Sequence, residues 1–348
     1  MTITKETIES AKGRFNIYTL VNATGAAVRL SEIGAGIVAL TAPDGHGRLA
    51  DVVLGYAQPT DYFYDGPCAG KIPGRYANRI ARGQFSLDGT DYQLAINNGP
   101  NALHGGPEGF SNKIWQSEPT ESGVVFTLTS PDGDENYPGN VEARVIYTWT
   151  EDNVLKIELW AITDAPTVIN LTNHTYFNLA GEGSGTVLDH TLQLAADKWL
   201  PTSDSLIPTG EMAPVAGTPM DFLEPKKLGH DIKADFDALR FGKGYDNCWV
   251  LDAEGTGDLI EAAELVDEKS GRVLRVFTDQ PAVQVYTGNW LAGAPVSKSG
   301  REYQDYDGVA IECQGMPDAP NHDNFPSQVL WPDDEYRRVI LFAFETTN

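Results

Sequence analysis

Apolar and polar residues alternate along several segments of this 348-residue chain, and the alternation predicts β-strands. In the segment 141–149 every second residue is apolar, and the segment 155–161 repeats the pattern. Residues 151–153, Glu-Asp-Asn, separate the two segments and predict a turn. A period of two places one face of each strand in a core and the other toward solvent.

The remaining apolar runs are short, and 35 glycines and 21 prolines interrupt them. Asp-Gly at 88–89 predicts a hairpin between 84–87 and 91–94, because this pair tolerates the positive φ of a tight turn. Short helical turns are expected only near 225–232. We therefore predict an all-β fold, a large antiparallel β-sandwich forming a single domain over residues 1–348. Further strands are predicted at 15–21, 36–41, 51–55, 190–196, 247–251, 273–277, 282–287, 309–314 and 339–344.

Polar side chains gather at the end of one predicted strand. Residues 167–172, Thr-Val-Ile-Asn-Leu-Thr, are rich in β-branched and apolar side chains and predict a buried strand. Asn173, His174, Tyr176 and Asn178 follow directly, before a glycine-rich loop. Hydrogen-bonding groups at the mouth of a rigid strand suit an uncharged, hydroxyl-rich ligand. They equally suit a structural corner, so this stretch alone leaves both interpretations open.

The charge of the chain excludes several classes of partner. Its 25 Lys and Arg oppose 49 Asp and Glu, which gives a net charge of −24 at pH 7. That charge repels nucleic acid and anionic membranes, and it disfavours a phosphorylated substrate. Solubility alone also accounts for a charge of this kind.

The cysteines and the apolar runs indicate the compartment. Cys68, Cys248 and Cys313 show no CxxC spacing, which argues against a disulfide framework or a zinc finger. The first residues lack the apolar segment of a secretory signal. No run approaches the roughly 18 apolar residues of a membrane-spanning helix. We therefore expect a protein of the reducing cytoplasm.

Two of the six histidines occupy unusual positions. His104 lies between a leucine and two glycines, on a loop that a ligand can approach closely, and His174 lies in the polar stretch. The other four histidines are expected on the surface. Glu312 interrupts an apolar strand, so it either pairs with a cation or faces a cleft. Asp246 begins another strand, where its simplest interpretation is a turn residue.

Three arginines, Arg75, Arg79 and Arg82, fall within eight residues. They either balance acids on a solvated face, or Arg79 and Asn78 donate hydrogen bonds to substrate oxygens. Gln284, on a β-patterned strand, is a further candidate donor.

From these residues alone three kinds of protein remain open. One is an enzyme that uses a His and a Glu as an acid/base pair. The second is a metal site, since two His and one carboxylate form a facial triad, although no HxH or HxxxH cluster supports it. The third is a non-catalytic, sugar-binding sandwich of the lectin type. Trp290 suits an apolar platform in such a site, but the core is its commoner location.

Seven short stretches, taken together and in order, resemble the galactose mutarotase (aldose 1-epimerase) family. Each stretch is weak alone, but the ordered set is specific. The stretches are Gly74-Arg-Tyr-Ala-Asn-Arg-Ile80, Asn101-Ala-Leu-His-Gly-Gly106, Asn170-Leu-Thr-Asn-His-Thr-Tyr-Phe-Asn-Leu-Ala-Gly181, Leu206-Ile-Pro-Thr-Gly210 with Val215-Ala-Gly-Thr-Pro-Met-Asp-Phe222, Gly244-Tyr-Asp246, Val283-Gln-Val-Tyr-Thr-Gly-Asn-Trp290 and Ile311-Glu-Cys-Gln314.

The resemblance implies a galactose-mutarotase-like supersandwich that interconverts the α and β anomers of a free aldohexose, galactose or glucose. It implies that Glu312 is the general base, that His174 is the general acid, and that His104 assists at the ring or C1 oxygen. No metal or cofactor is implied; the partner is a small-molecule sugar, and the chain is expected to be a monomer or weak homodimer. The residues implied to hold or surround the sugar are Asn78, Arg79, His104, Tyr176, Asp246 and Gln284.

Reference pKa values of about 4.3 for Glu and 6.5 for His leave Glu312 ionised near neutrality and allow His174 to carry a proton. Desolvation in an apolar strand should raise the proton affinity of Glu312, and Arg79 should oppose that effect. The sequence does not decide which effect is larger.

The chain departs from the family pattern at Asn247, because many relatives have His directly after the residue that corresponds to Asp246. A hexose-6-phosphate 1-epimerase remains an alternative, as does a glycosidase with Glu312 and Asp246 as its two carboxylates. The preferred sugar is not identified, because glucose and galactose differ at a single hydroxyl.

Overall fold

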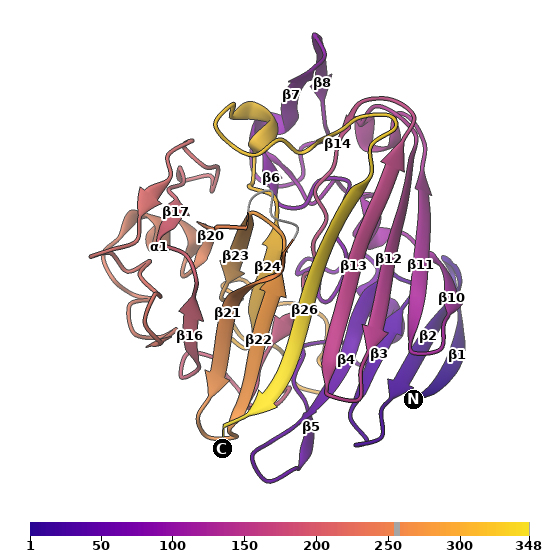
Figure 1. Ribbon diagram of the computed structural model, residues 1–348, viewed down its shortest axis with the longest axis vertical. Helices are drawn as coiled ribbons and strands as arrows, with labels where there is room; N and C mark the ends of the chain where they lie inside the picture. The colour runs from indigo at the N-terminus through magenta and orange to yellow at the C-terminus, as the bar shows by residue number, and fades with distance from the viewer. Residues whose placement is uncertain (254–257, 348) are drawn as a thin grey trace.

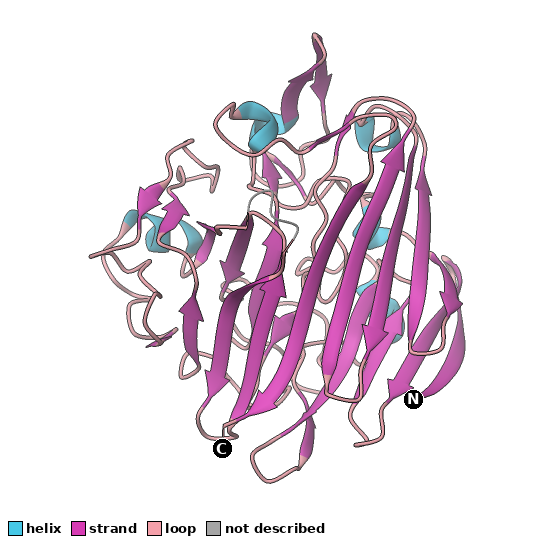
Figure 2. Ribbon diagram, viewed as in Figure 1, coloured by secondary structure: helices cyan, strands magenta, loops and turns pink. Residues whose placement is uncertain are grey.

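The computed structural model describes residues 1–253 and 258–347, and its named strands all pair in antiparallel fashion (Figure 1, Figure 2). The largest sheet has nine strands and forms the broad face toward the viewer in Figure 1. In spatial order its strands are β10 (Gln116–Pro119), β11 (Gly123–Ser130), β12 (Val141–Trp149), β13 (Val154–Thr163), β26 (Tyr336–Thr346), β22 (Arg272–Thr278), β21 (Ile260–Asp267), β16 (Thr191–Leu194) and β19 (Lys226–Lys227).

Two further sheets and three short strand pairs complete the β-structure. The six-stranded sheet consists of β15 (Tyr176–Phe177), β24 (Val309–Gln314), β23 (Ala282–Tyr286), β20 (Asp246–Val250), β17 (Lys198–Leu200) and β18 (Ala213–Pro214). The five-stranded sheet consists of β1 (Thr2–Ser10), β2 (Gly13–Val21), β3 (Ala27–Ser31), β4 (Gly36–Pro43) and β5 (Leu49–Asp51). The pairs are β6 (Arg79–Ile80) with β9 (Ala102–Leu103), β7 (Gln84–Leu87) with β8 (Thr90–Gln93), and β14 (Thr167–Val168) with β25 (Val329–Leu330).

Helices are few and short. None of the helices within the described residues is long and apolar enough to cross a membrane. They are α1 (Asp237–Gly242) and the 3-10 helices η1 (Pro59–Tyr62), η2 (Ala81–Gly83), η3 (Phe110–Asn112), η4 (Asp134–Asn136) and η5 (Ala319–Asn321).

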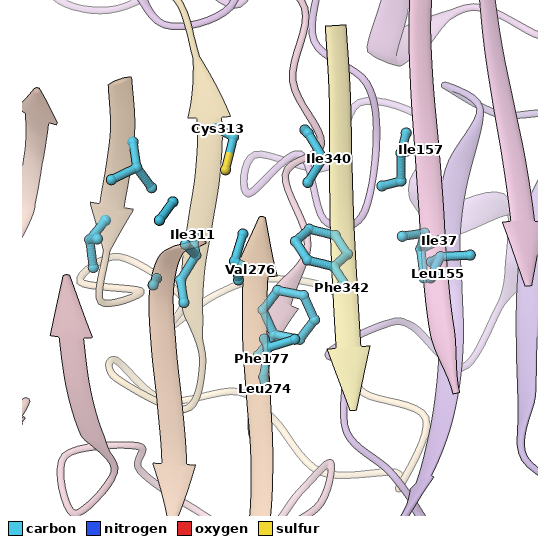
Figure 3. Packing of buried hydrophobic residues seen from close by; sticks show 14 of the residues in the cluster. Ile37, Leu155, Ile157, Phe177, Leu274, Val276, Ile311, Cys313, Ile340 and Phe342 are labelled. Carbon is cyan, nitrogen blue, oxygen red and sulfur yellow. The ribbon is translucent and has the colours of Figure 1, made fainter. Parts of the chain in front are cut away.

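Side chains from all three large sheets meet in one core (Figure 3). Ile37 of β4, Leu155 of β13 and Ile311 of β24 are each no more than 1% exposed. Phe177 of β15 packs edge-on against Phe342 of β26, with ring centroids 5.0 Å apart. Each fully buried side chain of this size contributes about 1.5–3 kcal/mol relative to an exposed one. This core fixes one face of the six-stranded sheet, and the other face of that sheet carries the site described below.

The alternation along the chain correctly predicted the central strands. Along β12 the five alternating apolar residues, Val141 to Trp149, are all buried, and the same holds for β13. The predicted hairpin is β7–β8, and Asp88 and Gly89 adopt φ of 49° and 76° at its turn. In contrast, β1 gives no apolar alternation because all of its residues are exposed or half-buried.

Three local predictions were wrong. Of the strand expected at 167–172 only Thr167 and Val168 pair regularly, because the chain then crosses between sheets and bonds to a loop: Asn170 N–H donates to the carbonyl oxygen of Arg75. The strand expected at 51–55 is β5, which already ends at Asp51. At 225–232 the chain forms strand β19 and then hydrogen-bonded turns, with His230 N–H donating to Lys227 O at 3.0 Å, but no helix; helix α1 begins at Asp237 instead.

Candidate active site

An open, polar cleft of about 1220 Å³ lies against the six-stranded sheet. Strand pairing builds its floor, because Glu312 of β24 is opposite Gln284 of β23, and Tyr286 of β23 is opposite Asp246 of β20. Cross-strand partners project from the same face of a sheet, so these four side chains share one face. The intervening apolar residues of the same strands point into the core. The period-two pattern therefore turns the polar positions of three strands toward one cavity.

Seven of the eight residues expected at the site line this cleft. The eighth, Gln284, is buried behind Asp246, to whose Oδ1 its Nε2 donates at 2.7 Å. The seven are Asn78, Arg79, His104, His174, Tyr176, Asp246 and Glu312.

His174 and Glu312 form a buried pair, with His174 Nε2 3.5 Å from Glu312 Oε1. Their side chains are only 6% and 2% exposed. The backbone of His174 is held on both sides, because its N–H donates to Lys71 O and its C=O accepts from Gly70 N–H, both at 2.9 Å. The Tyr176 ring lies 5.0 Å from the imidazole, centroid to centroid. The pair therefore has a defined geometry before any sugar binds.

Burial shifts both groups of this pair toward their neutral forms. Desolvation raises the pKa of Glu312 well above its usual value; Asp246 adds to that rise, and Arg79 opposes it. Desolvation lowers the pKa of His174 to about 4. A protonated His174 near neutrality, expected from its reference pKa, is thus disfavoured in the free protein. Burial favours the state in which the proton of the pair resides on Glu312.

His104 adds a second imidazole with a defined tautomer. The backbone N–H of Asn78 donates to His104 Nδ1 at 3.1 Å, and the backbone N–H of His104 donates to Asn78 O at 3.1 Å. Since Nδ1 accepts, the ring proton lies on Nε2. Desolvation holds the pKa of His104 well below its usual value, so this ring is neutral. It lies edge-on to the His174 ring, with centroids 5.2 Å apart.

The reciprocal bonds require an unusual backbone. Asn78 and His104 have φ of 65° and 52°, the left-handed region in which Asn and His are enriched among residues with a side chain. Each lies next to the two-residue pair β6–β9. These two short strands therefore present His104 and Arg79 together to the cleft.

Two other residues that line the cleft hold Arg79 in place. Its Nη2 lies 3.2 Å from Asp246 Oδ2, and its Nε donates to Asn98 Oδ1 at 3.0 Å. Asp246 is thus bound from two sides, by Arg79 and by Gln284. This is more than the turn role that sequence position alone suggested for the aspartate.

The other two arginines of the cluster have different environments. Arg75 is buried and donates to Ser130 and to the carbonyl oxygens of Pro131 and Pro138. Arg82 is exposed, with φ of 54°. Of the three, only Arg79 lines the cleft.

Several features of the site were missed or misjudged from the sequence. Trp290 is 61% exposed at the cleft rather than buried in the core. Tyr286 lines the cleft and was overlooked, although its position two residues after Gln284 placed it on the same strand face. His190, expected on the surface, is 1% exposed, and its Nε2 accepts from Leu179 N–H at 2.9 Å.

The departure at Asn247 lies outside the cleft lining. Asn247 is opposite Val285, on the core-facing side of β20, and is 1% exposed. Within residues 1–253 and 258–347, no group of three or more His, Cys, Asp or Glu side chains is placed to hold a metal ion.

The family model for aldose 1-epimerase matches residues 16–343. The galactose mutarotase of Homo sapiens is 43% identical over 311 residues, covering 89% of both chains. The aldose 1-epimerase of Escherichia coli (strain K12) is 39% identical over 333 residues, covering 95% of both.

Solved structures give the same result. A GalM/aldose epimerase homologue from C. elegans matches with a TM-score of 0.87 at 32% identity, covering 99% of this chain and 100% of that one. Galactose 1-epimerase from Lactobacillus acidophilus NCFM matches with a TM-score of 0.86 at 29% identity over 100% of both chains. The chain therefore belongs to the aldose 1-epimerase family of isomerases, which interconvert the anomers of aldoses.

Proposed function

We propose that this protein interconverts the α and β anomers of a free aldohexose by acid/base-assisted ring opening, with Glu312 as general base and His174 as general acid. The observation that carries this proposal is the buried pair of His174 and Glu312, 3.5 Å apart at the floor of an open polar cleft. A sugar placed across the pair would have its anomeric hydroxyl near one group and its ring oxygen near the other.

The reaction needs two proton transfers and no redox change. Glu312 removes the proton from O1 while His174 protonates the ring oxygen, and the ring opens to an aldehyde. Rotation about C1–C2 and closure from the other face then give the opposite anomer. During closure Glu312 returns its proton to O1 and His174 recovers the proton from the former ring oxygen.

His174 and Glu312 together carry one titratable proton both before and after the ring opens. With the closed sugar bound, the reactive form of the pair is imidazolium and carboxylate, the form that burial disfavours in the free protein. The pair becomes imidazole and carboxylic acid when the ring is open, and it returns to the charged form on closure. The burial that raises the pKa of Glu312 and lowers that of His174 stabilises the ring-opened state of the pair. Positioned acids and bases of this kind each contribute about 10²–10⁴-fold to rate.

The surrounding residues are proposed to orient the sugar. The neutral His104 would donate from Nε2 to the ring or C1 oxygen, assisting the acid and base. Arg79 and Asn78 would donate to sugar hydroxyls, and Asp246, held by Arg79 and Gln284, would accept from them. Tyr176 would form one wall.

The charge of the cleft favours a neutral sugar over a phosphorylated one. Within the described cleft lining Arg79 is the only Lys or Arg, and its guanidinium is already bound to Asp246 and Asn98. The acidic residues of the lining are Asp61, Asp65, Asp204, Asp246 and Glu312. A hexose 6-phosphate would meet this field without a free cation.

We further propose that the protein works in a reducing cytoplasm, as a single domain over residues 1–348 and as a monomer or weak homodimer. Its three cysteines are free, buried thiols.

Polarimetry of freshly dissolved α-galactose, α-glucose and their 6-phosphates tests the proposed reaction. We expect faster rotation change with the free sugars, galactose being the first to test because several relatives are named galactose mutarotase. Tight galactose binding without acceleration would instead indicate a lectin-like protein. Preference for the 6-phosphates would indicate a hexose-phosphate epimerase, and release of reducing sugar from an oligosaccharide would indicate a glycosidase.

A further inference from the structure

A buried ion pair joins Lys71, whose backbone carbonyl binds His174 N–H, to Asp65 at the edge of the cleft, and it has no part in the proton transfers. The Lys71 side chain is 1% exposed and that of Asp65 is 0% exposed. Besides the ion pair, Lys71 Nζ donates to Tyr62 O at 2.8 Å and to Asn112 Oδ1 at 3.3 Å. Lysine is almost never fully buried, so this ammonium needs a structural or functional reason.

The fold makes room for the lysine stem. A Cβ added at Gly34 would lie 2.9 Å from Lys71 Cδ, and one added at Gly36 would lie 3.1 Å from Lys71 Cγ. The stem therefore runs along a channel that two glycines leave open at the start of β4. A larger residue at either glycine would push the stem away from its partner.

Asp65 ties down the loop that leads to Lys71. Its Oδ2 accepts hydrogen bonds from Tyr56 OH and from Ala69 N–H, both at 2.8 Å. Together with the ion pair to Lys71, these bonds close the segment 65–71 on itself. The loop is therefore held at both ends by one buried carboxylate.

That loop holds both His174 and Tyr176. Gly70 N–H and Lys71 O bind the two backbone polar groups of His174, and Pro67 O accepts from Tyr176 OH at 2.9 Å. A shift of segment 65–71 would therefore displace the imidazole from Glu312.

We propose that the Lys71–Asp65 pair positions the acid His174, holding its imidazole against Glu312 and balancing the charge behind it. The proposal rests on the role proposed for His174 above. Lys71 and Asp65 act through His174 and are positioning residues; no proton transfer passes through either.

The charges of the pair act on His174 in opposite senses. Asp65 raises the pKa of His174, whereas Lys71 lowers it, and burial remains the largest cause of its low value. The other titratable groups that face the imidazole are Glu312, His104, Tyr176, Tyr286 and Asp246. None of those groups is substituted in the variants described below.

Lys71→Met, Asp65→Asn and the double variant test the proposal. We expect each single variant to lose about 10- to 100-fold in kcat on a free aldohexose, with KM changed by no more than about twofold. NMR titration of the His174 ring should show its pKa raised by Lys71→Met and lowered by Asp65→Asn. The double variant should return that pKa toward the wild-type value, which loosened packing alone would not do.

Lys298→Met is the matched control. Lys298 is a half-buried lysine, bound to Asp51 and to the carbonyl oxygens of Val38 and Val53. None of these residues is among the described residues that line the cleft. The variant should lose stability but keep the His174 titration and kcat. If Lys71→Met fails to fold, Gly36→Ala crowds the Lys71 stem at 3.1 Å, and Ile33 O at 3.2 Å, without removing a charge, and it should still lower kcat several-fold.

Unchanged kcat together with an unchanged His174 titration in Lys71→Met and Asp65→Asn would overturn the proposal, as would shifts of the same sign in both. The titration needs no turnover. A wild-type protein without epimerase activity, but with opposite shifts in the two variants, would therefore refute the proposed function and leave the positioning role supported.

Discussion

Replacing Glu312 by Gln removes the proposed base while preserving the shape of the side chain. Asp246 cannot substitute for it, because that carboxylate is held by Arg79 and Gln284. His174 remains 3.5 Å away but has no carboxylate with which to exchange a proton. We therefore expect sugar binding to persist and turnover to be nearly abolished.

The size of the loss follows from the chemistry of the pair. A positioned base contributes about 10²–10⁴-fold, which is about 3–5 kcal/mol of transition-state stabilisation. The fold itself should not weaken. Because the pKa of Glu312 is raised in the folded protein, ionising it above its unfolded pKa costs stability, and the neutral amide avoids that cost.

Polarimetric initial rates over a range of α-galactose concentrations, corrected for spontaneous mutarotation, measure this effect. We expect kcat to fall by about 10²–10⁴-fold with KM nearly unchanged. The control is Glu32→Gln, which alters a buried carboxylate bound by Asn16 and Ser117, away from the cleft. A Glu312→Gln protein with near-normal kcat would remove Glu312 from the mechanism, and one with raised KM alone would make it a binding residue.

Three further predictions concern residues around this pair. The pKa of His174 is about 4 in the fold and about 6.5 unfolded, so the unfolded chain binds more protons in that window and stability falls as pH drops through it. Through His174 the wild-type protein should lose about 2 kcal/mol of stability between pH 7 and pH 5, measured by urea unfolding, and His174→Asn should not show this loss. The variant should also lose most activity. An unchanged pH dependence of stability in the variant would contradict the low pKa. Arg75→Met should lower stability in thermal unfolding by about 3 kcal/mol or more, because carbonyl oxygens lose their donors, but it should leave KM unchanged. Arg79→Met should instead raise KM. A raised KM in Arg75→Met together with an unchanged KM in Arg79→Met would refute these assignments. Gly105→Ala would place a Cβ 1.8 Å from Gly74 O and should displace the His104 loop and lower kcat at least tenfold, about the loss expected of a misplaced catalytic group. The control Gly89→Ala, also at positive φ but with nothing within 4 Å, should cost only about 1 kcal/mol in unfolding and leave kcat unchanged.

Local sequence was sufficient for several strands that have one buried face, although β11 and β21 of the same sheet were not predicted. The alternation in β12 and β13 is a direct consequence of period-two geometry, so these strands could be predicted from residues alone. Asp88-Gly89 predicted its hairpin for a similar reason, because the turn demands positive φ. The segment 167–172 has equally β-like residues but lacks a strand partner over most of its length, and no local pattern reports the absence of a partner.

The sequence identified single residues with unusual positions, but it did not predict the protonation state that each residue has in the folded protein. A carboxylate in an apolar strand already marked Glu312 as unusual, and desolvation was the expected cause of a raised pKa. That desolvation outweighs the opposing charge of Arg79 depends on distances and burial that sequence does not contain. The same burial lowers the pKa of His174, which the reference value did not suggest.

The sequence by itself determined the all-β class, the strand faces and, through an ordered set of motifs, the family and the residues to examine. The class and the strand faces follow from hydrophobic period and turn chemistry, which act over a few positions, whereas the family follows from the resemblance of the ordered motifs. Only the tertiary structure decided that Arg79 serves the cleft while Arg75 supports a loop, that Trp290 is exposed, and that Lys71 lies buried behind His174. Burial and charge pairing depend on segments that are distant in the chain, and packing alone brings those segments together.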